Sequence, residues 1–237
     1  MNIAADYLAT LESLPEKQRR RFFEGEWSPD IEGALWTVDT LERNRLEARP
    51  GTTLDALLGA GLIPPLKRVV VGVDPSGAAG PEDKRSDEIG IVVAGLGTDG
   101  KGYVLADRTA RLGPAEWGRV AVNAFHEFRA DRIVAEQNFG GAMVEHVIRT
   151  AGPSVRVKTI VASRGKAVRA EPISALYEHG KVRHVGRFLP LEEQMLNMST
   201  AGYVGAKSPD RLDALVWALS DLMLAPQNTF TVQELRL

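Results

Sequence analysis

The chain has 237 residues, of which 44% are apolar and 25% are charged, and its formal net charge is −2. This composition is ordinary for a soluble globular protein with one sizeable domain and an appendage, and the charge argues against an indiscriminately basic nucleic-acid binder. The absence of cysteine excludes disulfides, thiolate catalysis and cysteine-ligated zinc. No apolar run approaches the ~18 residues of a membrane span and no signal peptide opens the chain, so a cytosolic protein without a membrane partner is expected.

The first 66 residues differ in pattern from the rest of the chain. Short helices are predicted near residues 5–13 and 15–23, and a further helix from about 38 to 48. The stretch that ends in Pro64-Pro65 resists both helix and sheet, and too few apolar positions share one register to form a separate core. Residues 1–66 are therefore interpreted as an arm or linker, the end of a larger neighbouring domain.

From Lys67 onward the pattern changes to strands and then to alternating strands and helices. A continuous apolar run such as RVVVGVD is typical of a strand buried on both faces, and Asp99-Gly100 is a hairpin signal between two strands. The predicted strands are 68–74, 88–96, 102–108, 132–136 and 155–161, with a short further strand in KVRHVG, and the predicted helices are 114–129, 141–150, 168–179, 190–198 and 209–224.

This order, three meandering strands followed by helix-linked strands, predicts a mixed five-stranded sheet with helices on both faces. It is the ribonuclease H-like α/β arrangement, expected over residues 67–226 with a tail at 227–237. In that arrangement the first strand is central and the fourth lies beside it, so the carboxyl ends of RVVVGVD and DRIVAE become neighbours. Many functions share the fold, so the fold alone establishes no activity.

Three carboxylates stand at the ends of separate core elements. Asp74 closes RVVVGVD, Glu136 closes DRIVAE, and Asp213 lies in the helix PDRLDALVWAL. Acids at such positions are costly to bury unless a cation collects them. If the fold brings the three together, their hard oxygen ligands would select Mg²⁺ or Mn²⁺, and two such ions could support phosphodiester cleavage.

Each acid also has an ordinary structural explanation. Asp74 in Asp-Pro-Ser-Gly could begin a turn, Glu136 could be an exposed strand terminus, and Asp213 could be a surface aspartate. The glycines that follow Glu136 could instead let a phosphate approach backbone N–H groups. A turn at Asp74, however, does not account for a second acid beside it.

Helix geometry separates the two acids of the last helix. With Ser208 as cap, successive residues advance by about 100°, and the apolar side chains cover one arc. Asp213 then lies roughly 60° beyond the edge of that arc and can reach the end of the sheet. Asp210 lies about 60° further toward solvent, where a helix-dipole or outer role is expected.

Residues 158–187 carry seven basic side chains against Glu171 and Glu178, a balance of +5. Such a run is commonly only a solvated surface, but beside an acidic cluster it suits a track for backbone phosphates. Lys166 is a candidate to hold the scissile phosphate, with Arg164 and Arg169 on flanking phosphates.

Other candidate sites are weaker. His179 and His184 flank a predicted turn and are expected at the surface, and Asp87 is more simply a loop residue than a fourth strand-end acid. No G-x-x-x-x-G-K-[ST] pattern occurs, which argues against a P-loop ATPase in this chain. Neither His126 nor His146 has metal-ligand spacing to another histidine, and the tryptophans are expected in the core.

Together these segments resemble the C-terminal nuclease domain of the large terminase subunit of tailed bacteriophages, a family that includes prophage and gene-transfer-agent terminases. The resemblance extends from about Ala5 to Leu224. It rests on the ordered motifs LPEKQRRRFFEGEW, GALW, VVVGVDPSG, SDEIGIVVAG, YVLADRT, PAEWGRVAV, RIVAEQNFGGAMVEHVI, SRGKAVRAEPISALYEHGKVRHVG, LEEQM and SPDRLDALVWAL.

The resemblance implies a two-metal endonuclease that cuts concatemeric double-stranded viral DNA during genome packaging in the host cell cytoplasm. The family's acids fall on Asp74, Glu136 and Asp213, and Asp210 also matches an acid position. Full-length members carry an N-terminal ATPase motor whose motifs are absent here, which implies an excised nuclease domain or a truncated gene. Implied partners are DNA, the portal protein, the small terminase subunit and that ATPase domain.

Two other interpretations remain open at this point. An actin-like or sugar-kinase-like ATPase would share the VGVDPSG turn, but it needs a second Asp-Gly turn and an adenosine-binding glycine motif that the sequence lacks. A non-catalytic module that docks on DNA or the portal protein would keep the fold without cutting.

Overall fold

The structure is a computed structural model that describes residues 31–75, 88–137 and 141–224. The chain separates into two compact units, residues 1–32 and 33–237, and all described helices and strands belong to the second. Outside the described residues lie the helices predicted at 5–13 and 15–23, Asp87, the turn residues 138–140 and the tail 227–237.

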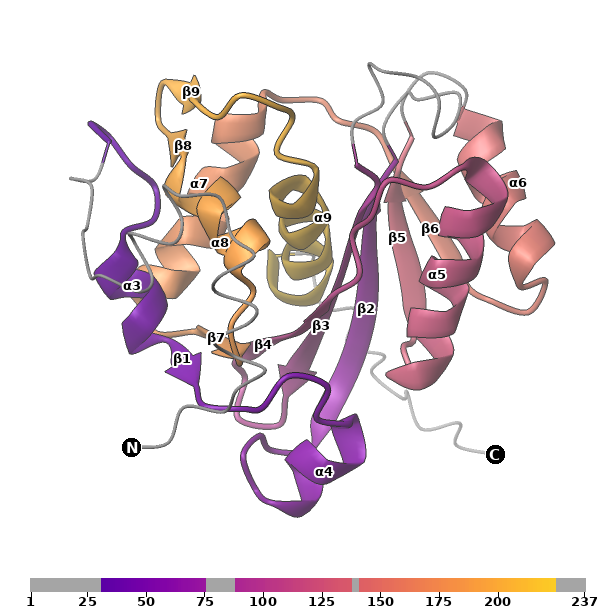
Figure 1. Cartoon of the computed structure of the whole chain (residues 1–237), viewed down its shortest axis with the longest axis horizontal. Helices are drawn as coiled ribbons and strands as arrows, with labels where there is room; N and C mark the ends of the chain where they lie inside the picture. The colour runs from indigo at the N-terminus through magenta and orange to yellow at the C-terminus, as the bar shows by residue number, and fades with distance from the viewer. Residues whose placement is uncertain (1–30, 76–87, 138–140, 225–237) are drawn as a thin grey trace, which may run out of the picture. The chain divides into compact units, whose positions relative to one another are not determined.

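A seven-stranded mixed sheet forms the centre of this second unit (Figure 1). Its spatial order is β1-β7-β4-β3-β2-β5-β6. The strands are β1 (Arg45–Leu46), β2 (Leu66–Asp74), β3 (Gly90–Gly97), β4 (Gly102–Asp107), β5 (Arg132–Glu136), β6 (Val157–Ile160) and β7 (Val182–Val185).

The predicted meander is present, since β2, β3 and β4 pair in antiparallel order. The expected neighbour relation is also confirmed, because β5 pairs in parallel with β2. The sheet has seven strands rather than the five predicted, because the short KVRHVG segment pairs with β4 and carries β1 on its outer edge.

Helices cover both faces of the sheet (Figure 1). The α5–α6 pair, with α4, packs on the face to which Val69, Val71 and Val73 of β2 point. The other face packs against α3, α7, α8 and α9. The helices are α3 (Val38–Arg43), α4 (Leu54–Gly59), α5 (Pro114–Glu127), α6 (Gly141–Ala151), α7 (Lys166–Glu178), α8 (Leu189–Leu196) and α9 (Asp210–Leu219), and a π-helix (Ser220–Leu224) continues α9.

Two glycines let α9 lie directly on the sheet. A side chain on Gly72 of β2 would collide with the carbonyl oxygen of Ala214, and one on Gly90 of β3 would collide with that of Asp210. Strand glycines often mark such close backbone approaches. The amino-terminal half of α9 is therefore pressed onto the ends of β2 and β3.

The described residues from Gly33 to β2 belong to this unit rather than to a separate arm, whereas residues 1–30 of the arm predicted over 1–66 lie outside the described residues. Helix α3 ends at Arg43, not near residue 48, and the next residues form β1. Leu54, Leu57 and Ile63 are buried in the core beside α5. Leu54 and Leu57 lie three residues apart in α4, but their packing partners come from distant segments, so the sequence alone did not reveal their burial.

His184 is fully buried, so the prediction of a surface position was wrong. Its strand, β7, lies between β1 and β4 rather than at a turn. The imidazole Nδ1 lies 2.9 Å from Glu192 Oε1 and Nε2 lies 2.8 Å from the Tyr177 hydroxyl. Arg45 donates to the same carboxylate at 2.8 and 3.1 Å. This buried network ties β1, β7 and α8 together.

In the described ranges, no helix combines the length and the apolar character needed to cross a membrane.

Candidate functional site

Two of the predicted acids lie at the carboxyl ends of adjacent strands. Val73 pairs with Ala135 in the parallel β2–β5 ladder, so Asp74 and Glu136 follow at the same edge of the sheet. Both side chains are buried, with 6% and 4% of their surface exposed. The exposed strand terminus considered for Glu136 does not fit this burial.

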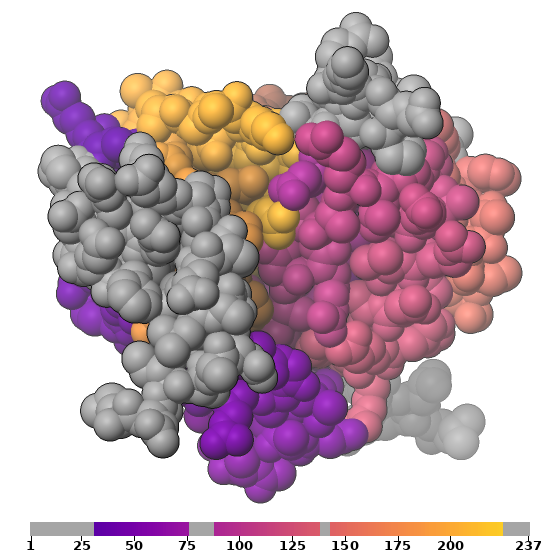
Figure 2. Space-filling view, viewed as in Figure 1, coloured from indigo at the N-terminus to yellow at the C-terminus, as the bar shows by residue number. Residues whose placement is uncertain are grey.

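Helix α9 adds two more carboxylates to this edge, Asp213 and Asp210. In the space-filling view, the gold part of the chain borders the magenta part, so distant segments meet on this face (Figure 2). Asp213 is 3% exposed, in line with its expected place beside the apolar arc. The outward position expected for Asp210 was wrong, because Asp210 is only 4% exposed. Contact between its backbone and Gly90 holds this end of the helix against the sheet.

The four carboxylates are close enough for their charges to act on one another. Burial raises the pKa of Asp74 well above its ordinary value, and the charges of Asp213, Glu136 and Asp210 raise it further. The ammonium group of Lys166 opposes this rise in the pKa of Asp74. The fold therefore gathers acids that repel one another, an arrangement that favours a bound cation.

Two basic side chains of α7 contact Asp213. Lys166 Nζ lies 2.5 Å from Asp213 Oδ2 in an ion pair without hydrogen-bond geometry, and it donates to Ser208 Oγ at 2.9 Å. Arg169 donates to Asp213 Oδ1 at 3.2 Å. Burial by itself would lower the pKa of Lys166, but the negative charge of the neighbouring Asp213 raises it. The third predicted phosphate ligand, Arg164, is exposed on the loop before α7.

The sequence did not single out Trp217 as part of the site. Its indole N–H donates to Glu136 Oε2 at 3.0 Å, and the guanidinium of Arg169 lies 4.6 Å from its ring centre. Trp217 is buried, as predicted, but it also orients a carboxylate. Its position four residues after Asp213, on the same side of the helix, was the available signal.

A second ion-pair network fixes the start of α9. Arg211 donates to both carboxylate oxygens of Glu88, at 2.9 Å each from one nitrogen, and to Asp107 Oδ2 at 2.7 Å. Glu88 precedes β3 and Asp107 ends β4, so this arginine ties the first turn of α9 to two strands. Bidentate pairs of this kind restrict orientation as well as adding energy.

The donor set fits a divalent metal. All four carboxylates are buried oxygen donors, the kind of ligand that Mg²⁺ and Mn²⁺ prefer. In the described part of the chain, no three acidic or histidine side chains are already gathered as a metal-holding group. Two of the acids are instead engaged by other side chains. Asp213 pairs with Lys166 and Arg169, and Glu136 accepts a hydrogen bond from Trp217.

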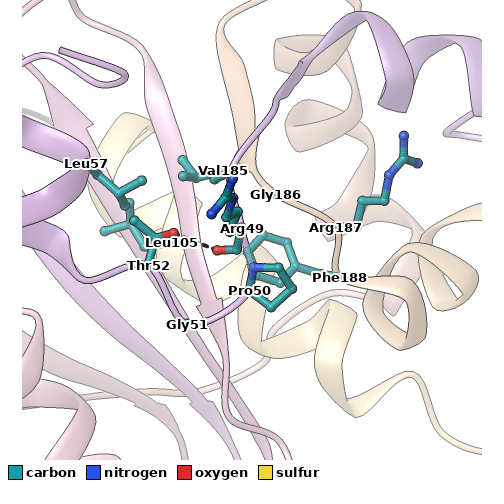
Figure 3. Close-up of a pocket in the computed structure, with 11 residues that line it drawn as sticks. Arg49, Pro50, Gly51, Thr52, Leu57, Leu105, Val185, Gly186, Arg187 and Phe188 are labelled. Atoms are coloured by element: carbon teal, nitrogen blue, oxygen red, sulfur yellow. Dashed lines mark hydrogen bonds between the residues drawn. The ribbon is translucent and has the colours of Figure 1, made fainter. Parts of the chain in front are cut away.

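A pocket of about 370 Å³, counted with the solvent at its mouth, lies elsewhere, between residues 48–52 and the β7–α8 connection (Figure 3). Its lining includes Arg49, Leu105 and Phe188 but no acidic residue. The Arg187 guanidinium points away from the cavity and pairs with Glu42. This pocket is not part of the acidic site.

A mixed sheet with helices on both faces, and buried carboxylates at the ends of two adjacent central strands, defines the ribonuclease H-like class. The family model for the terminase RNaseH-like domain matches residues 71–222. The chain belongs to this family, which confirms the resemblance drawn from its motifs. A search of curated proteins finds no significant match.

Solved structures agree on the fold. A point-mutant gp2c of the large terminase subunit from bacteriophage Sf6, with calcium, is 13% identical, with a TM-score of 0.55 over 78% of this chain and 98% of that chain. The large terminase nuclease of thermophilic phage G20c with bound cobalt is 13% identical, with a TM-score of 0.54 over 82% and 98%. A manganese-soaked human cytomegalovirus terminase nuclease domain is 16% identical, with a TM-score of 0.54 over 78% and 93%. At these identities, the likeness concerns the fold alone.

Proposed function

We propose that this chain is a divalent-metal-dependent endonuclease that cuts concatemeric double-stranded DNA during viral genome packaging. The observation that carries the proposal is the buried group of Asp74, Glu136, Asp213 and Asp210, in which neighbouring charges raise the pKa of Asp74. The structural neighbours that contain calcium, cobalt or manganese support the use of divalent ions.

Asp74, Glu136 and Asp213 would hold two ions, Mg²⁺ or Mn²⁺, with Asp210 as a further ligand. When bound, such ions activate a water molecule and stabilise the leaving oxygen of the phosphodiester. Trp217 keeps Glu136 oriented through its 3.0 Å hydrogen bond. Lys166 and Arg169, which contact Asp213 here, would bind the oxygens of the scissile phosphate, and Arg164 a flanking phosphate.

The family context adds further expectations. The portal protein, the small terminase subunit and an ATPase motor domain are the expected partners, and the host cytoplasm is the expected location. The alternative is a non-catalytic module that docks on DNA or the portal protein.

Nicking of supercoiled plasmid in Mg²⁺ or Mn²⁺ tests the proposal. We expect Asp74→Asn and Glu136→Gln to lower the rate by ~10²-fold or more, because electrostatic groups at reaction centres contribute on that scale. The exposed Asp55, paired with Arg129, supplies the control Asp55→Asn. DNA binding by the parent without cleavage in any divalent ion would favour the docking alternative, and full activity of Asp74→Asn would refute the metal site.

A further inference from the structure

A further buried carboxylate, Asp221, lies beyond the candidate catalytic acids on the π-helix and is 5% exposed. Lys158 Nζ lies 2.6 Å from its Oδ1 and Arg132 Nε lies 3.4 Å from its Oδ2. Arg68 donates to the backbone carbonyls of Asp221 and Leu222, at 2.9 Å each. We refer to these three basic side chains and Asp221 as the Asp221 cluster. It places three positive charges around one negative charge.

The cluster continues the line of the acidic site along one side of the last helix. Asp213, Trp217 and Asp221 are four residues apart, which keeps them on one side of the helix and advances ~6 Å per step. Lys166 and Arg169 contact Asp213, Arg169 also covers Trp217, and the Asp221 cluster follows. The basic side chains thus form a row that begins at the candidate metal site.

The register of β5 and β6 independently places Lys158 in the same direction from the acidic site. Ile160 of β6 pairs with Glu136, and Lys158 pairs with Val134. Lys158 therefore lies two residues, or ~7 Å, along the strand from the level of Glu136. Strand β6 is an edge of the sheet, so this row borders the outside of the molecule.

The cluster presents positive charge to its surroundings. The side chains of Lys158 and Arg132 are 43% and 33% exposed, whereas that of Asp221 is only 3% exposed. One carboxylate can neutralise only one of the three basic groups. The Nε of Arg68 is buried without a hydrogen-bond partner, so the cluster is not a balanced structural ion pair.

We propose that Lys158 and Arg132, supported by Arg68, bind backbone phosphates of duplex DNA and extend its path from the catalytic acids along β6. This inference rests on the proposed function, because it assumes that DNA occupies the acidic site. Cation–phosphate contacts of this type supply affinity without sequence preference and make binding dependent on salt.

Fluorescence anisotropy with a short labelled DNA duplex, in EDTA and over a range of KCl concentrations, tests the inference. The test protein is the full chain carrying Lys158→Gln and Arg132→Gln. The control carries Arg129→Gln and Arg149→Gln, which removes two exposed arginines, each also ion-paired, on the α5–α6 side. Two lost phosphate contacts should weaken binding about tenfold and reduce the slope of log K against log salt by about 1.8. The control should bind as the parent does.

Asp221→Asn separates DNA binding from a purely structural role. If the basic side chains bind phosphate, removal of the carboxylate should leave DNA affinity equal to or tighter than that of the parent. Affinity loss in Asp221→Asn as large as in the Lys158/Arg132 variant would overturn the inference, because a disturbed helix would then explain both. Affinity and salt slope equal to the control in the Lys158/Arg132 variant would also overturn it.

Plasmid cleavage by the parent in Mn²⁺ keeps the two proposals distinguishable. If the parent cuts DNA and the Lys158/Arg132 variant binds DNA as the parent does, the phosphate path is contradicted and the nuclease proposal is supported. If the parent binds DNA through Lys158 and Arg132 but does not cut it, the nuclease proposal is contradicted and the phosphate path is supported.

Discussion

The indole N–H of Trp217 donates to Glu136 Oε2 at 3.0 Å, so a residue of α9 fixes a carboxylate at the end of β5. Because Trp217 follows Asp213 by one helical turn, the helix that supplies Asp213 also orients Glu136. Arg169 covers the ring and also contacts Asp213, which joins α7 to the arrangement.

Trp217→Phe should keep the ring beneath Arg169 but remove the hydrogen bond to Glu136. A hydrogen bond to a charged group contributes about 1.5–3 kcal/mol, so we expect cleavage to fall roughly 10- to 100-fold while the protein stays folded. Plasmid nicking and thermal unfolding measure the two effects. Trp36→Phe is the matched control, because Trp36 is fully buried and its Nε1 has no hydrogen-bond partner. Equal activity of the two variants would contradict the orienting role.

Gly72→Ala should disturb the site without changing any polar group. The added methyl group would collide with the Ala214 carbonyl and push α9 away from β2. Overpacking of this kind costs about 1–3 kcal/mol, so we expect a lower melting temperature together with reduced cleavage. Gly59→Ala on α4, which would meet no neighbouring atom within 4 Å, should leave cleavage unchanged and the melting temperature equal or slightly higher. An unchanged melting temperature in Gly72→Ala would contradict the close approach.

Divalent ions should stabilise the parent protein, since an ion at the acidic site binds the folded state. At 100 times the dissociation constant, one bound ion adds about 2.7 kcal/mol to the free energy of unfolding. We expect Mn²⁺ to raise the melting temperature of the parent and of Asp55→Asn, but not that of Asp74→Asn. The same shift in Asp74→Asn would mean that the ion binds elsewhere.

Glu192 should make the folded state sensitive to acid. Burial raises the pKa of Glu192, but hydrogen bonds and charges from His184 and Arg45 outweigh it and lower the pKa from 4.5 to about 2. A lowered pKa stabilises the folded state above pH 4.5, and this stability is lost as pH falls toward 2. At neutral pH it corresponds to about 3 kcal/mol.

The variant Glu192→Gln should therefore unfold at lower denaturant concentration at pH 7, and its difference from the parent should shrink as pH falls from 4.5 to 2. Urea unfolding at several pH values measures this difference. Glu145→Gln, which loses an exposed pair with Arg149, should change stability by less than about 1 kcal/mol. A Glu192→Gln difference that does not vary with pH would contradict the assigned pKa.

A chain that begins at Gly33 should fold, whereas one that begins at Lys67 should not reach the same stability. The shorter chain loses Arg45, so the buried carboxylate of Glu192 keeps only His184 of these two partners. It also loses the core residues Leu54 and Leu57. Removing one partner of a buried pair costs about 3–5 kcal/mol. Circular dichroism melting of both chains provides the measurement. Equal melting temperatures would support the linker predicted for residues 1–66.

The sequence by itself determined the helices and the strands of the main sheet from Lys67 onward, the adjacency of Asp74 and Glu136, and the family. The element order follows from apolar runs and turn signals along the chain, and the adjacency of the two acids follows from the ribonuclease H-like arrangement that this order matches. The chain-wide motifs carried the family resemblance, which the match over residues 71–222 confirms.

Only the tertiary structure decided which side chains surround those acids. Asp210 was predicted to face solvent because a helical wheel does not include the sheet that Gly90 allows to approach. His184, the β1 strand and the Trp217–Glu136 hydrogen bond were missed for a related reason, since their partners lie at least seven residues and up to 139 residues away in sequence. Local patterns record the period of a helix or strand, whereas burial and charge pairing depend on which elements pack together.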